Sequence, residues 1–107
     1  MTDYEIYQGS FVYTLYRVTP SLRYIFLEID RPRRKVILKS YYEKEPSEIE
    51  KELIDDIGGD IIGMLDEPFD YEININITTA HIDSLEKKRF LLFARFEGLG
   101  YEDELTI

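Results

Sequence analysis

Cysteine and tryptophan are absent from this chain of 107 residues, and histidine occurs once, as His81. Without cysteine, the chain forms no disulfide, has no thiolate nucleophile and offers no Cys-based zinc or iron–sulfur site. A single histidine excludes a metal site built on a pair of histidines. No apolar run approaches the ~20 residues that a membrane-spanning helix needs. These absences exclude disulfide-stapled, thiol-dependent and helical membrane proteins.

The beginning of the chain, Met-Thr-Asp-Tyr-Glu, lacks the basic and apolar regions of a secretory signal. We therefore expect a soluble cytoplasmic protein. Hydrophobic residues make up 44% of the chain, which at this length is enough for a core that folds without staples. We predict a single domain over residues 1–107.

Basic side chains are few: 13 stand against 22 acidic ones, and the formal net charge is −9. The deficit is concentrated in residues 43–107, because residues 1–42 contain seven basic and only four acidic groups. This balance opposes direct binding to nucleic acid or to an anionic membrane and favours a basic partner. The alternative is that the acidic surface serves only solubility.

Four segments have the composition of β-strands. Residues 4–18 are rich in Tyr, Phe, Val and Thr, and residues 22–29 and 35–42 follow after short turns, which predicts an antiparallel meander. Residues 71–79 alternate regularly, which predicts a half-buried strand with one face inward and the other outward. The inward residues are Ile73, Ile75 and Ile77, and the outward ones are Glu72, Asn74 and Asn76.

A helix is predicted between the third and fourth of these strands. Its apolar residues recur every four positions, at Ile49, Leu53, Ile57, Ile61 and Leu65. Residues 47–50, Ser-Glu-Ile-Glu, form a capping-box pattern at its start. The pair at 58–59, Gly-Gly, is expected to end or interrupt it, with a second short turn through Met64. We expect Leu53 and Ile57 to pack against the inward isoleucines.

Residues 84–97 fit two patterns. A helix would begin at Ser84 and end before Gly98. A strand would instead place Phe90, Leu92, Ala94 and Phe96 on one face. The helix is favoured, because the Glu-Lys-Lys-Arg run and the terminal glycine suit it. The predicted fold class is α+β, an antiparallel sheet with helices packed on one face in the order βββαβα.

Catalytic motifs are missing. No Gly-rich phosphate loop and no Gly-x-Ser-x-Gly elbow is present. His81, near Asp83, could act as a general base, but a single loop histidine is more often an ordinary surface residue. The adjacent carboxylates at 55–56 and 66–67 could ligate Mg²⁺ or Ca²⁺, but neither pair lies in an EF-hand pattern. We predict no enzyme activity, no metal site and no cofactor.

The basic segment from Arg31 to Lys35 has two interpretations. It could grip a phosphate while Tyr41 and Tyr42 stack on bases. It could instead be the tip of a hairpin, with its charges paired locally to Glu28 and Asp30. The second is favoured, because the acidic remainder of the chain repels nucleic acid.

The predicted helix also has an acidic stripe. Glu48, Glu52 and Asp55 are spaced i, i+4 and i+7, on a face away from the apolar residues. With the acidic residues that follow, this stripe is our candidate partner-binding surface. Its members are Glu48, Glu52, Asp55, Asp56, Asp60, Asp66, Glu67 and Asp70.

In its size, its acidity and the acidic run from Glu48 to Asp56, the chain resembles the small cytoplasmic immunity proteins of bacterial toxin–immunity pairs, such as those of colicins and contact-dependent growth inhibition systems. The resemblance implies that it neutralises a cognate toxin, often a basic nuclease, by covering the toxin's active or substrate site. The alternative is an acidic secretion chaperone or adaptor, which would bind another protein through exposed apolar surface.

Overall fold

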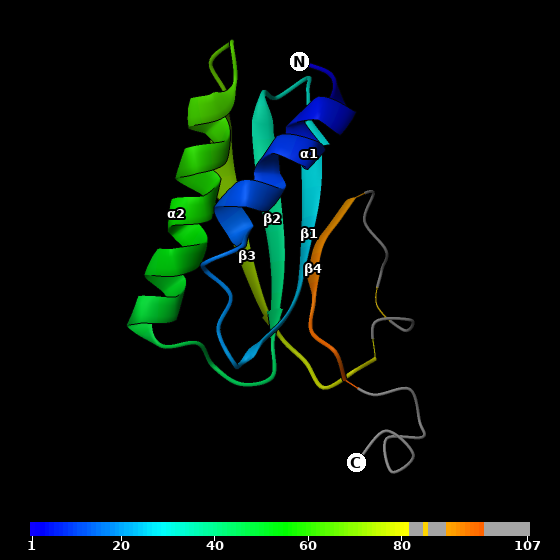
Figure 1. Ribbon diagram of the computed structural model, residues 1–107, viewed down its shortest axis with the longest axis vertical. Helices are drawn as coiled ribbons and strands as arrows, with labels where there is room; N and C mark the ends of the chain where they lie inside the picture. Colours follow the sequence, from blue (N-terminus) through cyan, green and yellow to red (C-terminus); the bar gives the residue numbers. More distant parts are fainter. Residues whose placement is uncertain (82–84, 86–89, 98–107) are drawn as a thin grey trace.

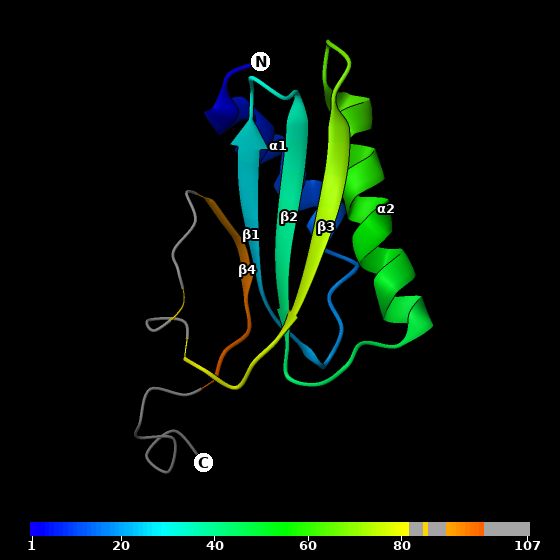
Figure 2. The ribbon, with the colours of Figure 1, turned by 180° about the vertical axis from the view of Figure 1, so that it is seen from behind.

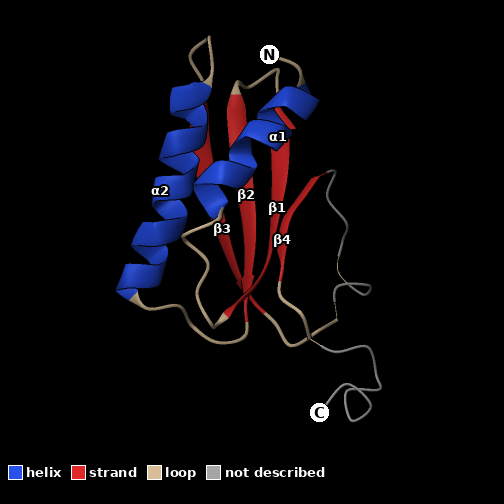
Figure 3. Cartoon of the chain, in the orientation of Figure 1, coloured by secondary structure: helices blue, strands red, loops and turns tan. Residues whose placement is uncertain are grey.

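The computed structural model describes residues 1–81, 85 and 90–97. Its elements in chain order are α1 (Asp3–Thr14), β1 (Leu22–Asp30), β2 (Lys35–Tyr42), α2 (Glu48–Met64), β3 (Asp70–Ile77) and β4 (Phe90–Ala94). The strands form one sheet in the order β3-β2-β1-β4, and both helices lie on the same face of it (Figures 1 and 3). The predicted α+β class is confirmed, but the element order is αββαββ rather than βββαβα.

The sheet is mixed, so the prediction of a wholly antiparallel sheet is wrong. β1 pairs antiparallel with both β2 and β4, whereas β2 and β3 run parallel, from Lys35 opposite Asp70 to Tyr42 opposite Ile77. The parallel pair arises because α2 connects the end of β2 to the start of β3, and a crossover helix returns the chain for a strand in the same direction. Of the predicted three-stranded meander, only β1 and β2 form an antiparallel hairpin, because its first segment is a helix.

The N-terminal segment is a helix, not the predicted strand over residues 4–18. A capping box between Thr2 and Glu5 begins α1. Its buried face consists of Ile6, Ser10 and Thr14, and the two hydroxyls donate hydrogen bonds to the carbonyls four residues earlier, at 2.7 and 3.1 Å. The polar residues on this face remove the apolar stripe that usually reveals a helix.

The predicted helix over residues 84–97 is wrong where the structure describes it, because β4 occupies Phe90–Ala94. The alternative interpretation as a strand is confirmed there. The predicted boundaries at Ser84 and Gly98 and the acidic tail lie outside the described residues. α1 packs on β4: the Tyr7 ring stacks on Phe90 with centroids 4.6 Å apart, and its hydroxyl donates to the Leu91 carbonyl at 2.8 Å.

α2 begins at the predicted capping box of Ser47 and Glu50. It runs through Gly58 and Gly59 without a break, so the predicted interruption is wrong. Gly58 instead permits a close approach, because a Cβ atom there would lie 2.4 Å from Cδ2 of Tyr71 on β3. The buried face of α2 contributes Ile54, Ile57 and Ile61 to the core. The sheet contributes Ile25, Leu27, Val36 and Leu38.

β3 is an outer strand of the sheet, as Figure 2 shows from behind. Ile73 packs against the core, but Ile75 and Ile77 are 37% and 52% exposed. The prediction that all three isoleucines are buried under the helix is wrong for these two. Among the described residues, no helix is long and apolar enough to span a membrane.

Candidate binding groove

A groove of about 360 Å³ lies between α2 and the outer strand β3. Its helix wall is charged and its strand wall is apolar. α2 contributes Glu48, Lys51, Glu52 and Asp55, and β3 contributes Ile73 and Ile75. A surface with apolar area beside like charges can desolvate a partner's side chains and select the sign of their charge.

Local sequence patterns build both walls. The i, i+4, i+7 spacing places Glu48, Glu52 and Asp55 on one face of α2, as predicted. The capping box at Ser47 fixes the start of the helix, which sets Glu48 in its first turn. Along β3 the period of two places Ile73 and Ile75 on the same side of the sheet, beneath that face.

The charged wall is only partly neutralised within the chain. The Asp55 carboxylate accepts a hydrogen bond from the Tyr71 hydroxyl at 3.0 Å, which raises the pKa of Tyr71. Lys51 lies 3.3 Å from a carboxylate oxygen of Glu45 and 3.6 Å from one of Glu48. Glu52 is exposed and forms no ion pair within the part of the chain that the structure describes. The wall therefore retains a net acidic charge.

The family model for the MafI2 immunity protein matches residues 11–97. The chain belongs to this family. The match includes all of α2 and β3, and with them every residue that lines the groove. No curated protein matches the chain. The resemblance to toxin-immunity proteins, seen in the sequence, is confirmed.

The other predicted site residues of this MafI2 family member lie outside the groove. Asp60 pairs with Arg17 at 2.5 Å, and Asp66 lies 3.6 Å from the N-terminal amine. Glu67 lies 3.8 Å from Arg31. The remaining two are Asp56, exposed on α2, and Asp70, whose carboxylate accepts the Tyr71 N–H at 2.9 Å.

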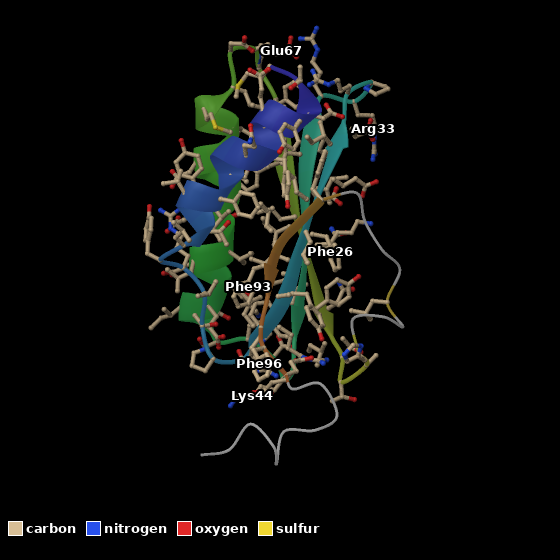
Figure 4. All side chains as sticks on the ribbon, turned by 45° about the vertical axis from the view of Figure 1, so that its right-hand side comes forward. Phe26, Arg33, Lys44, Glu67, Phe93 and Phe96 are labelled. Atoms are coloured by element: carbon tan, nitrogen blue, oxygen red, sulfur yellow. The ribbon has the colours of Figure 1, made fainter. Side chains whose placement is uncertain are left out.

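The predicted acidic surface is thus divided along the molecule. The 17 residues of α2 extend about 25 Å, which separates its first turn from the loop that follows it. Figure 4 shows Glu67 at one end of the molecule and Lys44, shortly before α2, at the other. The structure brings together three of the eight predicted residues, Glu48, Glu52 and Asp55.

A second surface escaped the sequence analysis. The outer side of α1 and the segment after it expose large apolar side chains: Tyr4, Phe11, Val12, Leu15, Tyr16 and Val18. The interpretation of residues 4–18 as a strand hid this surface. The signal that could have revealed it was the capping-box pattern of Thr2 and Glu5, which marks the start of a helix.

A separate polar cluster connects β1 to the residues that follow β3 and β4. Arg23 of β1 binds Glu97 through Nε at 2.5 Å and Nη2 at 2.6 Å, and donates to the Thr78 carbonyl at 2.7 Å. Tyr24 also donates to Glu97, and Arg95 lies 3.1 Å from it. The hydrogen bonds from Arg23, above all, lower the pKa of Glu97 to about 2. These groups satisfy one another, so the cluster connects strands rather than presenting charge.

The basic segment lies in the turn between β1 and β2, in agreement with the hairpin interpretation. Arg33 pairs with Asp30 and Arg31 pairs with Asp3, each at 2.7 Å. His81 is exposed after β3, and its predicted neighbour Asp83 lies outside the described residues. Among the residues described, no group of three or more His, Asp or Glu side chains could hold a metal ion.

Proposed function

We propose that the chain neutralises a cognate bacterial toxin by binding it at the groove between α2 and β3. Membership of the MafI2 immunity family supports the toxin as partner. The observation that favours the groove is its composition, with Glu48, Glu52 and Asp55 opposite Ile73 and Ile75. The apolar wall would supply desolvated contact area, and the carboxylates would select a basic toxin surface.

The toxin on this proposal is a basic nuclease. Carboxylates of the immunity protein would occupy positions where the nuclease holds substrate phosphates. A net charge of −9 would also draw a basic protein toward the chain and raise its association rate by ~10- to 1000-fold. The immunity protein would act in the cytoplasm, by occupancy alone, without turnover and without a cofactor.

The exposed apolar side of α1 favours a second candidate function. A secretion chaperone or adaptor would hold its client through apolar area of this kind, with anchors such as Phe11 and Tyr16. Such a protein would raise the yield or export of its client without reducing the client's toxicity. This difference separates the two candidates.

The test is a growth assay with the toxin encoded by the open reading frame directly upstream. Cells that express the toxin domain alone should stop growing, and co-expression of the chain should restore growth. Because occupancy requires one chain per toxin, the purified toxin domain should lose its activity at an equimolar ratio. Inactivation at a small fraction of that ratio would indicate turnover, and toxicity that persists beside the folded chain would contradict the proposed function.

A further inference from the structure

On the outer edge of β3, the backbone N–H and C=O groups form no hydrogen bonds to another strand within the described residues. The Asp70 N–H donates to the Arg34 carbonyl at 2.9 Å, and the Thr78 N–H donates to the Tyr42 carbonyl at 3.0 Å. The backbone N–H and C=O groups of the even-numbered residues of β3 therefore point toward β2. The N–H and C=O of one strand residue point to the same edge, and those of the next residue point to the opposite edge, so the N–H and C=O groups of Ile73, Ile75 and Ile77 point outward.

This edge lacks most of the features by which sheets usually avoid pairing with another chain, and its charged residues, Asp70 and Glu72, lie only at the start of β3. Short length, bulges, lysine and proline are the common protections. The opposite edge has two of them, because β4 is five residues long and its register with β1 shifts at Ile25 and Phe26. β3 has eight residues, pairs with β2 without a shift and contains neither lysine nor proline. It also exposes Ile75 and Ile77.

We propose that the toxin docks by adding an extended basic segment to the β3 edge, which would become a fifth strand of the sheet. This inference rests on the proposed function and specifies how the partner binds. A strand added ~4.8 Å beyond β3 would place alternate side chains on the helix side of the sheet, next to the charged wall of the groove. Lysine or arginine at those positions would face Glu48, Glu52 and Asp55.

Charge decides between the toxin and a second copy of this chain as the occupant. Two copies paired through β3 would bring their two charged walls together, and like charges across an interface oppose association. A basic segment would instead meet opposite charge on the helix side. The backbone hydrogen bonds would provide affinity, and the acidic wall would provide selectivity, as in other cases of strand addition.

The most direct test is residue-resolved amide hydrogen exchange by NMR, on the chain alone and with the toxin domain from the upstream open reading frame. The amides of Ile73, Ile75 and Ile77 should exchange rapidly in the free chain and at least about tenfold more slowly in the complex. The amides of Asn74 and Asn76, which face β2, should be protected in both states. A complex in which the three outward amides exchange as before would overturn strand addition and leave the proposed function intact. Absence of any complex would overturn both.

A substitution tests the same edge by affinity. Ile75→Pro removes an outward N–H but no bond to β2, and edge strands tolerate proline. It should raise the Kd for the toxin domain at least about tenfold. The control Ile75→Thr keeps the N–H and the β-branched shape, and should change the Kd much less. Equal losses in both variants would assign the effect to the side chain and contradict strand addition. Circular dichroism checks the fold, and the exchange experiment decides the question if Ile75→Pro does not fold.

Sedimentation of the free chain tests whether a second copy of the chain binds at the β3 edge. We expect a monomer at micromolar concentration, because the charged walls of two copies repel each other. A dimer that Ile75→Pro abolishes would assign the β3 edge to self-association and overturn the proposal.

Discussion

Gly58 sets the distance between α2 and the outer strand. It lies in the middle of the helix, directly against the Tyr71 ring, where any Cβ atom would be 2.4 Å from Cδ2 and 2.9 Å from Cε2. This close approach allows the Tyr71 hydroxyl to reach Asp55 on the charged wall. A residue that the sequence pattern marked as a helix end therefore positions the groove.

Replacement of Gly58 by alanine should destabilise the protein even though alanine is the better helix former. The methyl group must displace a packed ring, which costs about 1–3 kcal/mol. Gly59→Ala is the matched control, because nothing lies within 4 Å of its Cβ position. It should stabilise the protein by up to about 1 kcal/mol. Equilibrium urea unfolding gives both values, and equal changes in the two variants would contradict the close approach at Gly58.

Glu97 should make stability depend on pH. Hydrogen bonds from Arg23, then from Tyr24 and Arg95, hold its pKa at about 2 in the folded chain, against 4.5 for an ordinary glutamate. The contribution of Glu97 to the free energy of unfolding is therefore complete above about pH 4.5 and is lost as the pH falls toward 2. Glu97→Gln should lower the free energy of unfolding at pH 7 by about 3 kcal/mol, because Arg23 keeps its charge without its partner. The deficit should shrink between pH 4.5 and pH 2, and a deficit of constant size would show that the contribution is not electrostatic.

At the scale of elements, composition and alternation predicted β1, β2 and β3, whose inward side chains are mostly apolar. The capping box of Ser47 and Glu50 located the start of α2, although Ile49 of the predicted apolar stripe is 69% exposed. α1 was missed because two of its three buried residues, Ser10 and Thr14, are polar and satisfy their hydroxyls within the helix. The outer side of α1 is apolar as well, so the segment has the composition of a strand.

β4 and the strand order required information that local patterns do not contain. Over residues 84–97, a helical pattern and a strand pattern each fit part of the apolar side chains, and only the pairing of Phe90–Ala94 with β1 selects the strand there. The parallel pairing of β2 with β3 follows from the crossover through α2, once the first segment is known to be a helix. Because the sheet edge was unknown, the sequence could not predict that Ile75 and Ile77 would be exposed.

Truncation of an isoleucine in α2 and of one at the edge of the sheet should have very unequal effects on stability. Ile57 is fully buried, so Ile57→Ala should lower the free energy of unfolding by about 2–5 kcal/mol. Ile77 is 52% exposed at the sheet edge, and Ile77→Ala should cost far less. Chemical denaturation of the two variants measures the difference. Similar losses would mean that the edge of β3 is covered in the free protein.

For the whole molecule, acidic residues outnumber basic ones by 22 to 13, but only three of the eight predicted binding residues line the groove. The sequence pattern predicted the stripe of Glu48, Glu52 and Asp55 correctly, since helical spacing alone decides it. It could not separate these residues from Asp60, which Arg17 of the segment after α1 neutralises. The sequence also predicted that the isoleucines of β3 lie beside α2, but not that β3 is an outer strand, which is why Ile75 forms part of an open groove instead of the core.

The measurement that tests this account most directly is the rate of association with the toxin domain, by surface plasmon resonance at two salt concentrations. The comparison is among the wild type, Glu52→Lys and Asp66→Lys. The two variants make the same change of charge at exposed positions, but only Glu52 lines the groove, and Asp66 follows the far end of α2, about 20 Å along the helix. Neither change should alter folding stability by more than about 0.5 kcal/mol.

At ~0.1 M salt, where charges act over ~10 Å, Glu52→Lys should slow association about tenfold, and Asp66→Lys, which lies beyond that length from the groove, should slow it much less. At ~1 M salt, where that length falls to ~3 Å, the three rates should converge. Equal rates for the two variants, or a wild-type rate that does not change with salt, would contradict the groove as the toxin's docking site and direct attention to the apolar side of α1.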